Sequence, residues 1–362
     1  MMMRHRLLGS LLGLGVSLGA VAQEAGQQRI DPAPVEVAPE IARLGDQVST
    51  ERLMETIRAL PPARSGWGDE RHWEGLLEAE KLVIERLEAL GLKVQTQEIP
   101  WPARRSRFVA PDREEGVTEE ALRERARFRN IWVDLVGDEA PHEALVLGAH
   151  LDAVRGSPGA DDDGTGVAAI LELARVLKDQ RRARTLRLML FNLEEAGLIG
   201  SRHYVAACLD REQETIIGMA SLDMLGYFSD EPGSQRSPIR AIEGVFEPPT
   251  VGDFIAMGGI LRHREFSQRL GGLMVAGAPE LKVLVADFLP FAPPDMLRSD
   301  HAPFLAAGVP AVIISDTANF RSEHYHSASD TAETLDEERF TLVVRGLAVA
   351  AAQMTAARHD EG

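Results

Sequence analysis

This sequence has a single cysteine and fewer basic than acidic residues. Its single cysteine, Cys208, can form neither a disulfide within the chain nor a cysteine-only metal cluster. The neighbours of Cys208 follow a helical pattern, so we expect a buried structural thiol rather than a nucleophile. Lysine and arginine number 39 against 56 aspartates and glutamates, which gives a net charge of −17. Because phosphate binding needs a basic face, this balance argues against a nucleic-acid partner.

Long apolar runs are also missing. No stretch approaches the roughly 20 apolar residues that a membrane-spanning helix needs, so we expect no membrane span. The first residues instead resemble an export signal, with a basic start at Arg4–Arg6, an apolar run over Leu7–Leu18 and small residues at Ala20–Ala22. We interpret residues 1–22 as a signal peptide cleaved near Ala22 and expect an exported protein, periplasmic or extracellular.

The rest of the chain divides into a short linker and one domain. Residues 23–45 contain three prolines and little apolar periodicity, which predicts a flexible linker. Residues 46–362 are long enough for one large domain with a substantial core. Apolar residues at helical spacing predict helices over 76–90, 166–177, 198–209 and 335–357, whereas continuous apolar runs predict strands over 94–99, 131–135, 144–148, 186–192, 215–224, 254–260 and 310–315.

This alternation predicts the fold class. Continuous apolar strands separated by helices indicate a mostly parallel sheet that is covered on both faces. We therefore expect an α/β protein with a single three-layer α/β/α domain. Residues 102–128 are charged and rich in arginine, which predicts a surface excursion, and residues 228–253 are rich in proline, glycine and acids, which predicts a long loop.

Acids and histidines follow the predicted strands one after another. The strand over 144–148 leads to His150 and Asp152, and then to the string Asp161–Asp162–Asp163 just before a helix. The strand over 186–192 leads to Glu194 and Glu195. The next leads to Asp223, and the last to a loop with His324 and His326. Functional groups collect at the carboxyl ends of the strands in open α/β sheets, so we expect these side chains to meet.

Such a cluster is suited to metal ions. Charged groups at the ends of buried strands incur a large desolvation penalty, which divalent cations offset. Two histidines with three or four carboxylates match the ligand count of two zinc ions about 3.5–4 Å apart. Asp152 is placed to orient the imidazole of His150. Of the adjacent Glu194 and Glu195, one can bind metal while the other serves as a base.

The motifs also resemble a known family. The segments GAHLDAVRGSPGADDDGTGVAAILELARVL, NLEEAGLIGSRHY, SLDMLGY, SDHAPFLAAGVPAVIISDTANF and YHSASDT are similar, in this order, to those of the co-catalytic dizinc aminopeptidases. That family includes secreted bacterial leucyl aminopeptidases and, more distantly, glutamate carboxypeptidase II and glutaminyl cyclases. The likeness runs from about Leu53 to the terminal helix, and it implies the zinc-exopeptidase fold.

The resemblance implies a role for each matching residue. It assigns His150 and Asp223 to one Zn²⁺, Glu195 and His326 to the other, and Asp161 as the bridge, after which a cis peptide often follows in the family. His326 is favoured over His324 because it lies in the pattern Tyr325–Thr331. Glu194 matches the general base and Asp152 the acid behind the first histidine. Ser299, Asp300 and His301 match an element near the site that contacts substrate or supports the ligands.

The implied reaction is removal of N-terminal residues from peptide substrates. A hydroxide on the two zinc ions would attack the scissile carbonyl, while Glu194 takes the proton of the water and delivers it to the departing amine. Some family members polarise the carbonyl with a tyrosine three residues before the Ser-Asp-His element, but that position is Met296 here. Tyr325 is the candidate substitute.

Three alternatives stay open within this fold. A carboxypeptidase would need basic groups that clamp a terminal carboxylate, and Arg298 and Arg321 lie near the motifs. A glutaminyl cyclase keeps much of the same ligand set, but typically carries an insertion between the glutamate pair and the following Gly-Ser-Arg-His. Here only four residues separate Glu195 from Gly200. A metal-free receptor would have replaced ligands, and none of the six positions is replaced.

Overall fold

The computed structural model describes residues 32–66, 68–99, 127–209, 214–238, 247–288 and 294–356. The predicted signal peptide and most of the excursion over 102–128 lie outside these residues. The strands are β1 (Val94–Glu98), β2 (Arg129–Leu135), β3 (Ala140–His150), β4 (Arg184–Phe191), β5 (Thr215–Leu222), β6 (Ile255–Ile260), β7 (Val283–Phe288) and β8 (Ala311–Ser315). The α-helices are α2 (Pro39–Ala42), α3 (Thr50–Ala59), α4 (Glu70–Ala89), α6 (Gly164–Leu177), α7 (Ile199–Leu209), α8 (Arg264–Gly277), α9 (His301–Ala306) and α10 (Glu337–Thr355).

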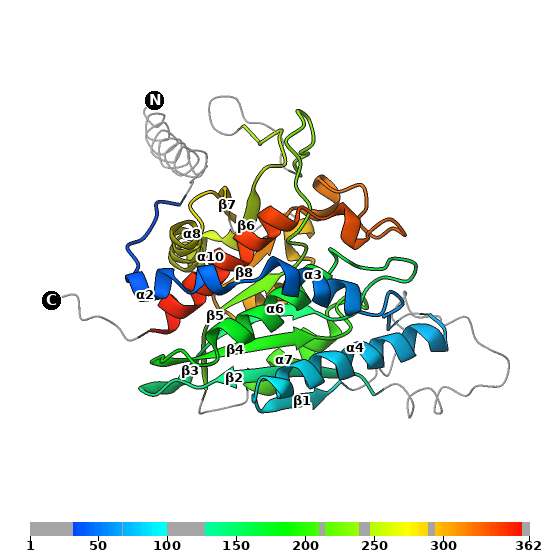
Figure 1. Ribbon diagram of the computed structural model, residues 1–362, viewed down its shortest axis with the longest axis horizontal. Coiled ribbons are helices and arrows are strands. Elements are labelled where there is room, and N and C mark those ends of the chain that lie inside the picture. Colours follow the sequence, from blue (N-terminus) through cyan, green and yellow to red (C-terminus); the bar gives the residue numbers. More distant parts are fainter. Residues whose placement is uncertain are drawn as a thin grey trace, which may run out of the picture.

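All eight described strands form one sheet in the order β1-β2-β4-β3-β5-β8-β6-β7. The four central strands, β4, β3, β5 and β8, are parallel. β2 runs antiparallel to β4, and β6 runs antiparallel to β8. The prediction of a mostly parallel sheet is therefore confirmed, with the antiparallel pairs towards its two edges (Figure 1).

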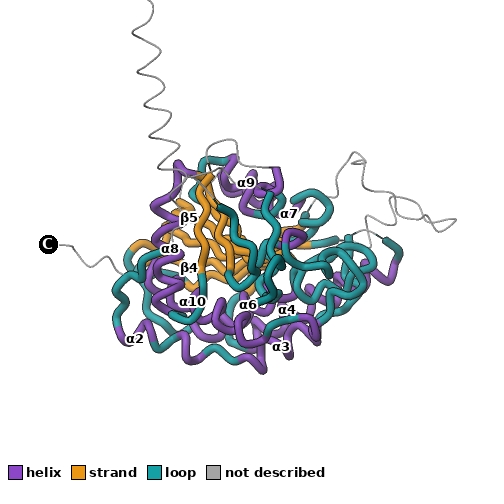
Figure 2. Tube along the Cα trace, turned by 90° about the horizontal axis from the view of Figure 1, so that it is seen from above, coloured by secondary structure: helices purple, strands orange, loops and turns teal. Residues whose placement is uncertain are grey.

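Helices cover both faces of the sheet. α6, α10 and α8 pack together on one face, with α3 and α4 beside α6, whereas α7 and α9 lie on the other (Figure 2). Side chains of β3 alternate between the two cores: Leu145 and Leu147 belong to the larger cluster, and Val146 belongs to the smaller one under α7 and α9. This alternation follows from the two-residue period of a strand and confirms the three-layer arrangement.

The smaller core contains a group of four packed aromatic rings. Trp132, Phe191, Tyr204 and Phe304 lie with ring centroids 5.9–6.0 Å apart, three of the four contacts being edge-to-face. Beside them the buried Arg187 binds the carboxylates of Asp134 and Glu214. Cys208 lies in α7 as expected, but its side chain is outside the described part of the chain.

The fold begins earlier than the sequence indicates. Residues 23–45 are predicted to form a flexible linker, yet the described part of that range contains α2 and packs on the domain. Leu44 is 2% exposed, and the amide of Val35 donates to the carbonyl of Gly272 in α8 at 3.4 Å. A second difference is the stretch over 262–298, for which the sequence predicts no regular element and which contains α8 and β7.

One further feature agrees with the sequence. The described residues of 228–253 contain no helix or strand. Among the described residues, every helix is too short or too polar to cross a lipid bilayer.

Candidate metal centre

The predicted residues meet at the carboxyl ends of the central strands. His150 is the last residue of β3, Asp223 follows β5 directly, and Glu194 and Glu195 lie just beyond β4. β3 is hydrogen-bonded to β4 on one side and to β5 on the other, so the chain reverses its direction of travel across the sheet at β3. Such a switch point opens a crevice between the loops of neighbouring strands. The loop after β8 brings His326 to the same place.

Asp162 lies between the two histidines. One of its carboxylate oxygens is 3.0 Å from Nε2 of His150, and the other is 3.1 Å from Nε2 of His326. The same nitrogen of His326 is 3.2 Å from Oε1 of Glu195. Donor atoms lie within 4.8 Å of one another in three groups: His150–Asp162–Asp223, Asp162–Glu195–His326 and His150–Glu194–Glu195. Asp162 is shared by the first two groups, so it is the residue that joins the two halves of the site.

This placement differs from the assignment of Asp161 as the bridge. One carboxylate oxygen of Asp161 accepts the amide of Gly226 at 2.9 Å and the hydroxyl of Thr165 at 3.2 Å, away from both histidines. The reason lies in the loop: three successive aspartates point in three directions, and the repeated residue type hides which one faces the site. The cis peptide bond joins Asp162 to Asp163, one residue later than the resemblance suggested.

Asp163, the last of the three aspartates, binds backbone amides rather than facing the histidines. One oxygen accepts the amide of Gly166 at 3.0 Å and caps α6, while the other accepts the amide of His150 at 2.9 Å. A side-chain cap of this kind satisfies backbone donors that the first turn of a helix leaves free. Asp163 therefore ties the start of α6 to the end of β3, and the loop that carries Asp162 is held between them.

Asp152 supports the glutamate pair more closely than it supports His150. Nδ1–H of His150 donates to the backbone oxygen of Asp152 at 2.9 Å, whereas the nearer carboxylate oxygen is 3.8 Å away. The two carboxylate oxygens accept the amides of Glu194 at 2.9 Å and Glu195 at 3.3 Å. The Nδ1–H donor fixes the tautomer of His150 and leaves Nε2 for the site. The predicted orienting role thus falls largely to the main chain of Asp152.

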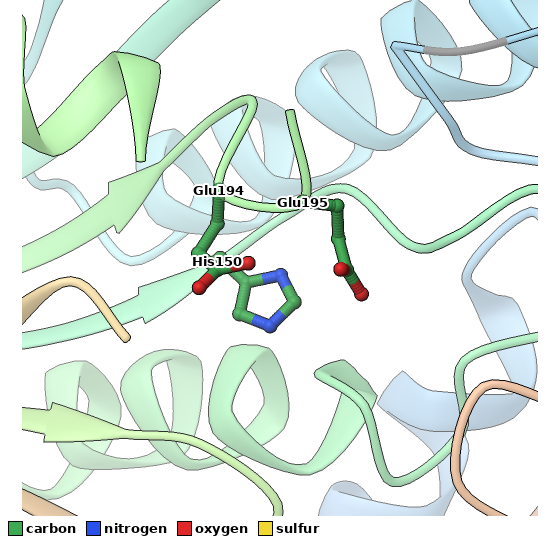
Figure 3. Close-up of side chains that lie close together, drawn as sticks. All are labelled: His150, Glu194 and Glu195. Carbon is green, nitrogen blue, oxygen red and sulfur yellow. The ribbon is translucent and has the colours of Figure 1, made fainter. Parts of the chain in front are cut away.

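The turn before the glutamates has an unusual backbone. Leu193 has φ of 58°, in the left-handed region that branched side chains rarely adopt. The side-chain oxygen of Asn192 accepts the amide of Leu193 at 2.9 Å, and the side-chain amide of Asn192 donates to the buried Glu80. As Figure 3 shows, the side chain of Glu194 lies against the imidazole of His150, and that of Glu195 projects from the same loop beside it.

The electrostatics of the site favour cations. Burial raises the pKa of Glu194 well above its usual range, raises that of Glu195 to about 7 and also raises that of Asp223. Burial opposes protonation of His326, yet its hydrogen bonds to Asp162 and Glu195 raise its pKa to about 10. Carboxylates gathered out of water need either protons or metal ions to offset their charge. With imidazole nitrogens and carboxylate oxygens as donors, the set fits zinc.

The Ser-Asp-His element lies under the site, outside the three donor groups. The hydroxyl of Ser299 is 2.9 Å from that of Ser221, and Asp300 is fully buried, which raises its pKa to about 7. Nε2 of His301 lies 2.8 Å from the backbone oxygen of Met296, and burial lowers the pKa of His301 to about 4.

The loop after β8 carries two further candidates with different surroundings. Nδ1 of His324 is hydrogen-bonded to the hydroxyl of Ser329. Tyr325 instead stacks on His326, with ring centroids 3.7 Å apart.

Two residues that the sequence analysis did not single out, Asp330 and Arg64, hold the loop that carries Asp162 in place. The carboxylate of Asp330 accepts the amides of Asp161 at 2.8 Å and Asp162 at 3.2 Å. It lies within the quoted pattern Tyr325–Thr331, so the motif itself was the available signal. Arg64 is completely buried and donates to the backbone oxygens of Leu151, Pro158 and Gly159. Its position in a loop between two helices gives no such signal.

Replacing Arg64 by methionine is expected to lower the free energy of unfolding by on the order of 3 kcal/mol, because several buried carbonyls lose a charged donor. Urea titration would measure the change. Arg181→Met is the matched control, because that arginine is exposed and pairs with Asp138 at the surface. A loss no greater than that of the control would show that Arg64 does not hold the loop.

Comparisons with known proteins identify the family of the chain. The model of Peptidase family M28 matches residues 130–248 and 262–351. YfbL of Escherichia coli strain K12, described as uncharacterized, is 31% identical over 233 residues, which cover 61% of this chain and 69% of that protein. An aminopeptidase of Pseudomonas aeruginosa is 37% identical over 118 residues, but these cover only 30% of this chain and 22% of that longer protein.

Solved structures show the same fold. BSAP, a zinc aminopeptidase from Bacillus subtilis, has a TM-score of 0.62 at 17% identity, covering 87% of this chain and 97% of that one. The LapA aminopeptidase of Legionella pneumophila has a TM-score of 0.63 at 18% identity, covering 89% of this chain and 76% of that one. The family match spans more than half of the sequence, so the chain belongs to peptidase family M28. The resemblance drawn from the motifs is thereby confirmed, and with it the class of metallopeptidase.

Proposed function

We propose that this chain is an exported aminopeptidase that uses two zinc ions to remove N-terminal residues from peptides. The observation that carries the proposal is the position of Asp162, whose two oxygens face two different histidines, each with a further carboxylate nearby. One ion would be held by His150, Asp162 and Asp223, and the other by Asp162, Glu195 and His326. When bound, such ions polarise a carbonyl oxygen and lower the pKa of a water molecule.

Glu194 is the residue we assign as general base. It belongs to neither of the two donor groups that share Asp162, so both ions could bind without it. It is 7% exposed, and burial raises its pKa, with Glu195 and Asp300 adding to the effect. A carboxylate with a raised pKa accepts a proton from water and returns it to a leaving amine more readily than an ordinary glutamate.

Tyr325 is the residue we assign to donate a hydrogen bond to the substrate carbonyl. A tyrosine hydroxyl is ordinarily protonated at neutral pH, and burial together with the charges of Asp162 and Glu195 raises the pKa of Tyr325 further. A protonated hydroxyl at the site of developing negative charge stabilises the transition state.

The two arginines considered for a carboxypeptidase differ in availability. Arg321 is 6% exposed; it donates to Gln235 and to the backbone oxygen of Tyr227, and lies over the ring of Phe254. Burial and these contacts engage two of its three nitrogens within the protein. Arg298 has a side chain that is 43% exposed. The names of the relatives, together with the engagement of Arg321, support cleavage from the N-terminal end.

The experiment compares three kinds of substrate with one purified sample. We expect hydrolysis of Leu-p-nitroanilide, none of its N-acetylated form, and none of a peptide blocked at its N-terminus with a free carboxyl end. EDTA should abolish activity and Zn²⁺ should restore it, because metal supplies the polarising charge. Release of the C-terminal residue from the blocked peptide would instead identify a carboxypeptidase. Cyclisation of N-terminal glutamine without hydrolysis would identify a cyclase.

Export is the second part of the proposal. It is supported by the basic start, the short apolar run and the small residues that end at Ala22. The proposal places the protein in the periplasm or outside the cell, with Gln23 at its N-terminus after cleavage.

A further inference from the structure

Arg298 is an exposed arginine that directly precedes the Ser-Asp-His element. Its guanidinium donates to the hydroxyl of Tyr325 at 2.5 Å and lies over the Tyr325 ring at 5.6 Å from the centroid. A second nitrogen is 3.2 Å from a carboxylate oxygen of Asp295 and 3.2 Å from the side-chain oxygen of Asn319. We propose that Arg298 is a positioning residue that holds the Tyr325 hydroxyl with its proton free for the substrate carbonyl, an inference that rests on the proposed function.

The donors and acceptors of the Tyr325 hydroxyl give the first support for this role of Arg298. A tyrosine hydroxyl has one proton to donate and lone pairs to accept. Arginine is a donor only, so the bond between Arg298 and Tyr325 must use a lone pair of the phenol oxygen. The phenolic proton is therefore directed elsewhere. No other hydrogen bond of this hydroxyl appears among the described residues, so the proton is available to a substrate oxygen.

Two flat groups fix the ring itself. Tyr325 stacks on His326 with an interplanar angle of 21° on one side, and Arg298 lies against the ring as well. A planar guanidinium can stack and donate at once, which an ammonium group cannot. Because His326 is a proposed metal ligand, this stacking fixes the distance between the phenol and the metal centre.

Met296 explains why such a pair is needed. Some members of the resembled family have a tyrosine at this position. In this chain the Met296 side chain packs against the backbone of β6, so that a methyl group added at Gly258 would lie 2.1 Å from its terminal carbon. A thioether has no proton to donate. The donor to the carbonyl oxygen must then come from another residue, and Tyr325 with Arg298 supplies one.

The neighbours of Arg298 bear on the competing role, in which Arg298 would bind a substrate carboxylate. Asp295 already offsets part of its charge, and the contacts to Asp295, Asn319 and Tyr325 use three of the five N–H donors of the guanidinium. A substrate carboxylate would compete with Asp295 for the same charge. The positive charge of Arg298 also lies near Asp223, whose pKa it lowers against the larger effect of burial.

The test is a double-mutant cycle with Tyr325→Phe and Arg298→Met, followed with Leu-p-nitroanilide. Tyr325→Phe is expected to lower kcat by about 10²-fold, the loss typical of removing one oxyanion donor, with KM changed less than kcat. Arg298→Met is expected to lower kcat less, and to have no further effect once Tyr325 is phenylalanine. Arg298→Lys should restore only part of the activity, because lysine cannot stack and donate together. Arg181→Met is the control for loss of a surface arginine.

Binding of leucine phosphonic acid gives a second readout. Its tetrahedral oxygens resemble the transition state, whereas the product leucine does not. Both variants are expected to weaken binding of the phosphonate more than binding of leucine, with zinc content unchanged. Additive effects of the two substitutions would overturn the inference. So would an Arg298→Met variant that loses activity only towards substrates with acidic side chains, which would make Arg298 a carboxylate-binding residue. A wild-type chain that cleaves no free-amine substrate would overturn the proposed function, and this inference with it.

Discussion

Replacing Glu194 by glutamine is expected to lower kcat for Leu-p-nitroanilide by about 10²–10⁴-fold, the range that a general acid–base group contributes. Glutamine matches glutamate in shape but cannot take a proton from water. Neither donor group that shares Asp162 includes Glu194, so the variant should keep its full zinc content. Steady-state kinetics and metal analysis on the same sample would measure both quantities.

The control is Glu85→Gln, which changes an exposed glutamate on α4 in the same way and should leave kcat unchanged. Zinc lost together with activity would make Glu194 a ligand rather than the base. An active Glu194→Gln variant with two ions bound would remove Glu194 from the mechanism.

Replacing Asp162 by asparagine is expected to abolish activity and to leave fewer than two zinc ions per chain. A bridge needs two anionic oxygens, and asparagine has one neutral oxygen. The neighbouring Asp161→Asn is the matched comparison, since its oxygen could still accept the amide of Gly226. That variant should keep both ions and most of the activity. Zinc content and hydrolysis of Leu-p-nitroanilide would be measured for both variants.

The reverse pattern, in which Asp161→Asn loses metal and Asp162→Asn does not, would return the bridge to Asp161. Equal loss in both variants would mean that the loop tolerates no change of charge, and Asp163→Asn would then be needed to separate the cap of α6 from the bridge. Circular dichroism on each variant would show whether the fold is kept.

Most of the sheet was predictable, because its central strands are continuous apolar runs. The structure has strands where such runs predict them, at β3, β4, β5 and β8. The acids and histidines that follow these strands in the sequence were enough to predict a metal site at their carboxyl ends. The stretch over 262–298 was not predictable in the same way. α8 and β7 lie near one edge of the sheet, where polar residues interrupt the apolar pattern that marks a buried element.

The site shows more clearly what could not be predicted from the sequence. His150 and Asp223 each stand alone in their motif, Glu195 and His326 were chosen over a like neighbour through the resemblance, and the structure brings all four together. Asp161, Asp162 and Asp163 are identical in chemistry, so only the path of the backbone decides which one faces the histidines. That path depends on distant groups: Asp330 holds two of the amides and Arg64 holds the carbonyls before them. Contacts of this kind leave no periodic signal in a sequence.

The central claim is that two zinc ions share Asp162. Anomalous diffraction at the zinc edge, from crystals of the zinc-loaded protein, tests it most directly. The account predicts two peaks per chain about 3.5–4 Å apart, with an oxygen of Asp162 next to each, His150 and Asp223 at one and Glu195 and His326 at the other. A single peak, or a pair bridged by Asp161, would contradict it.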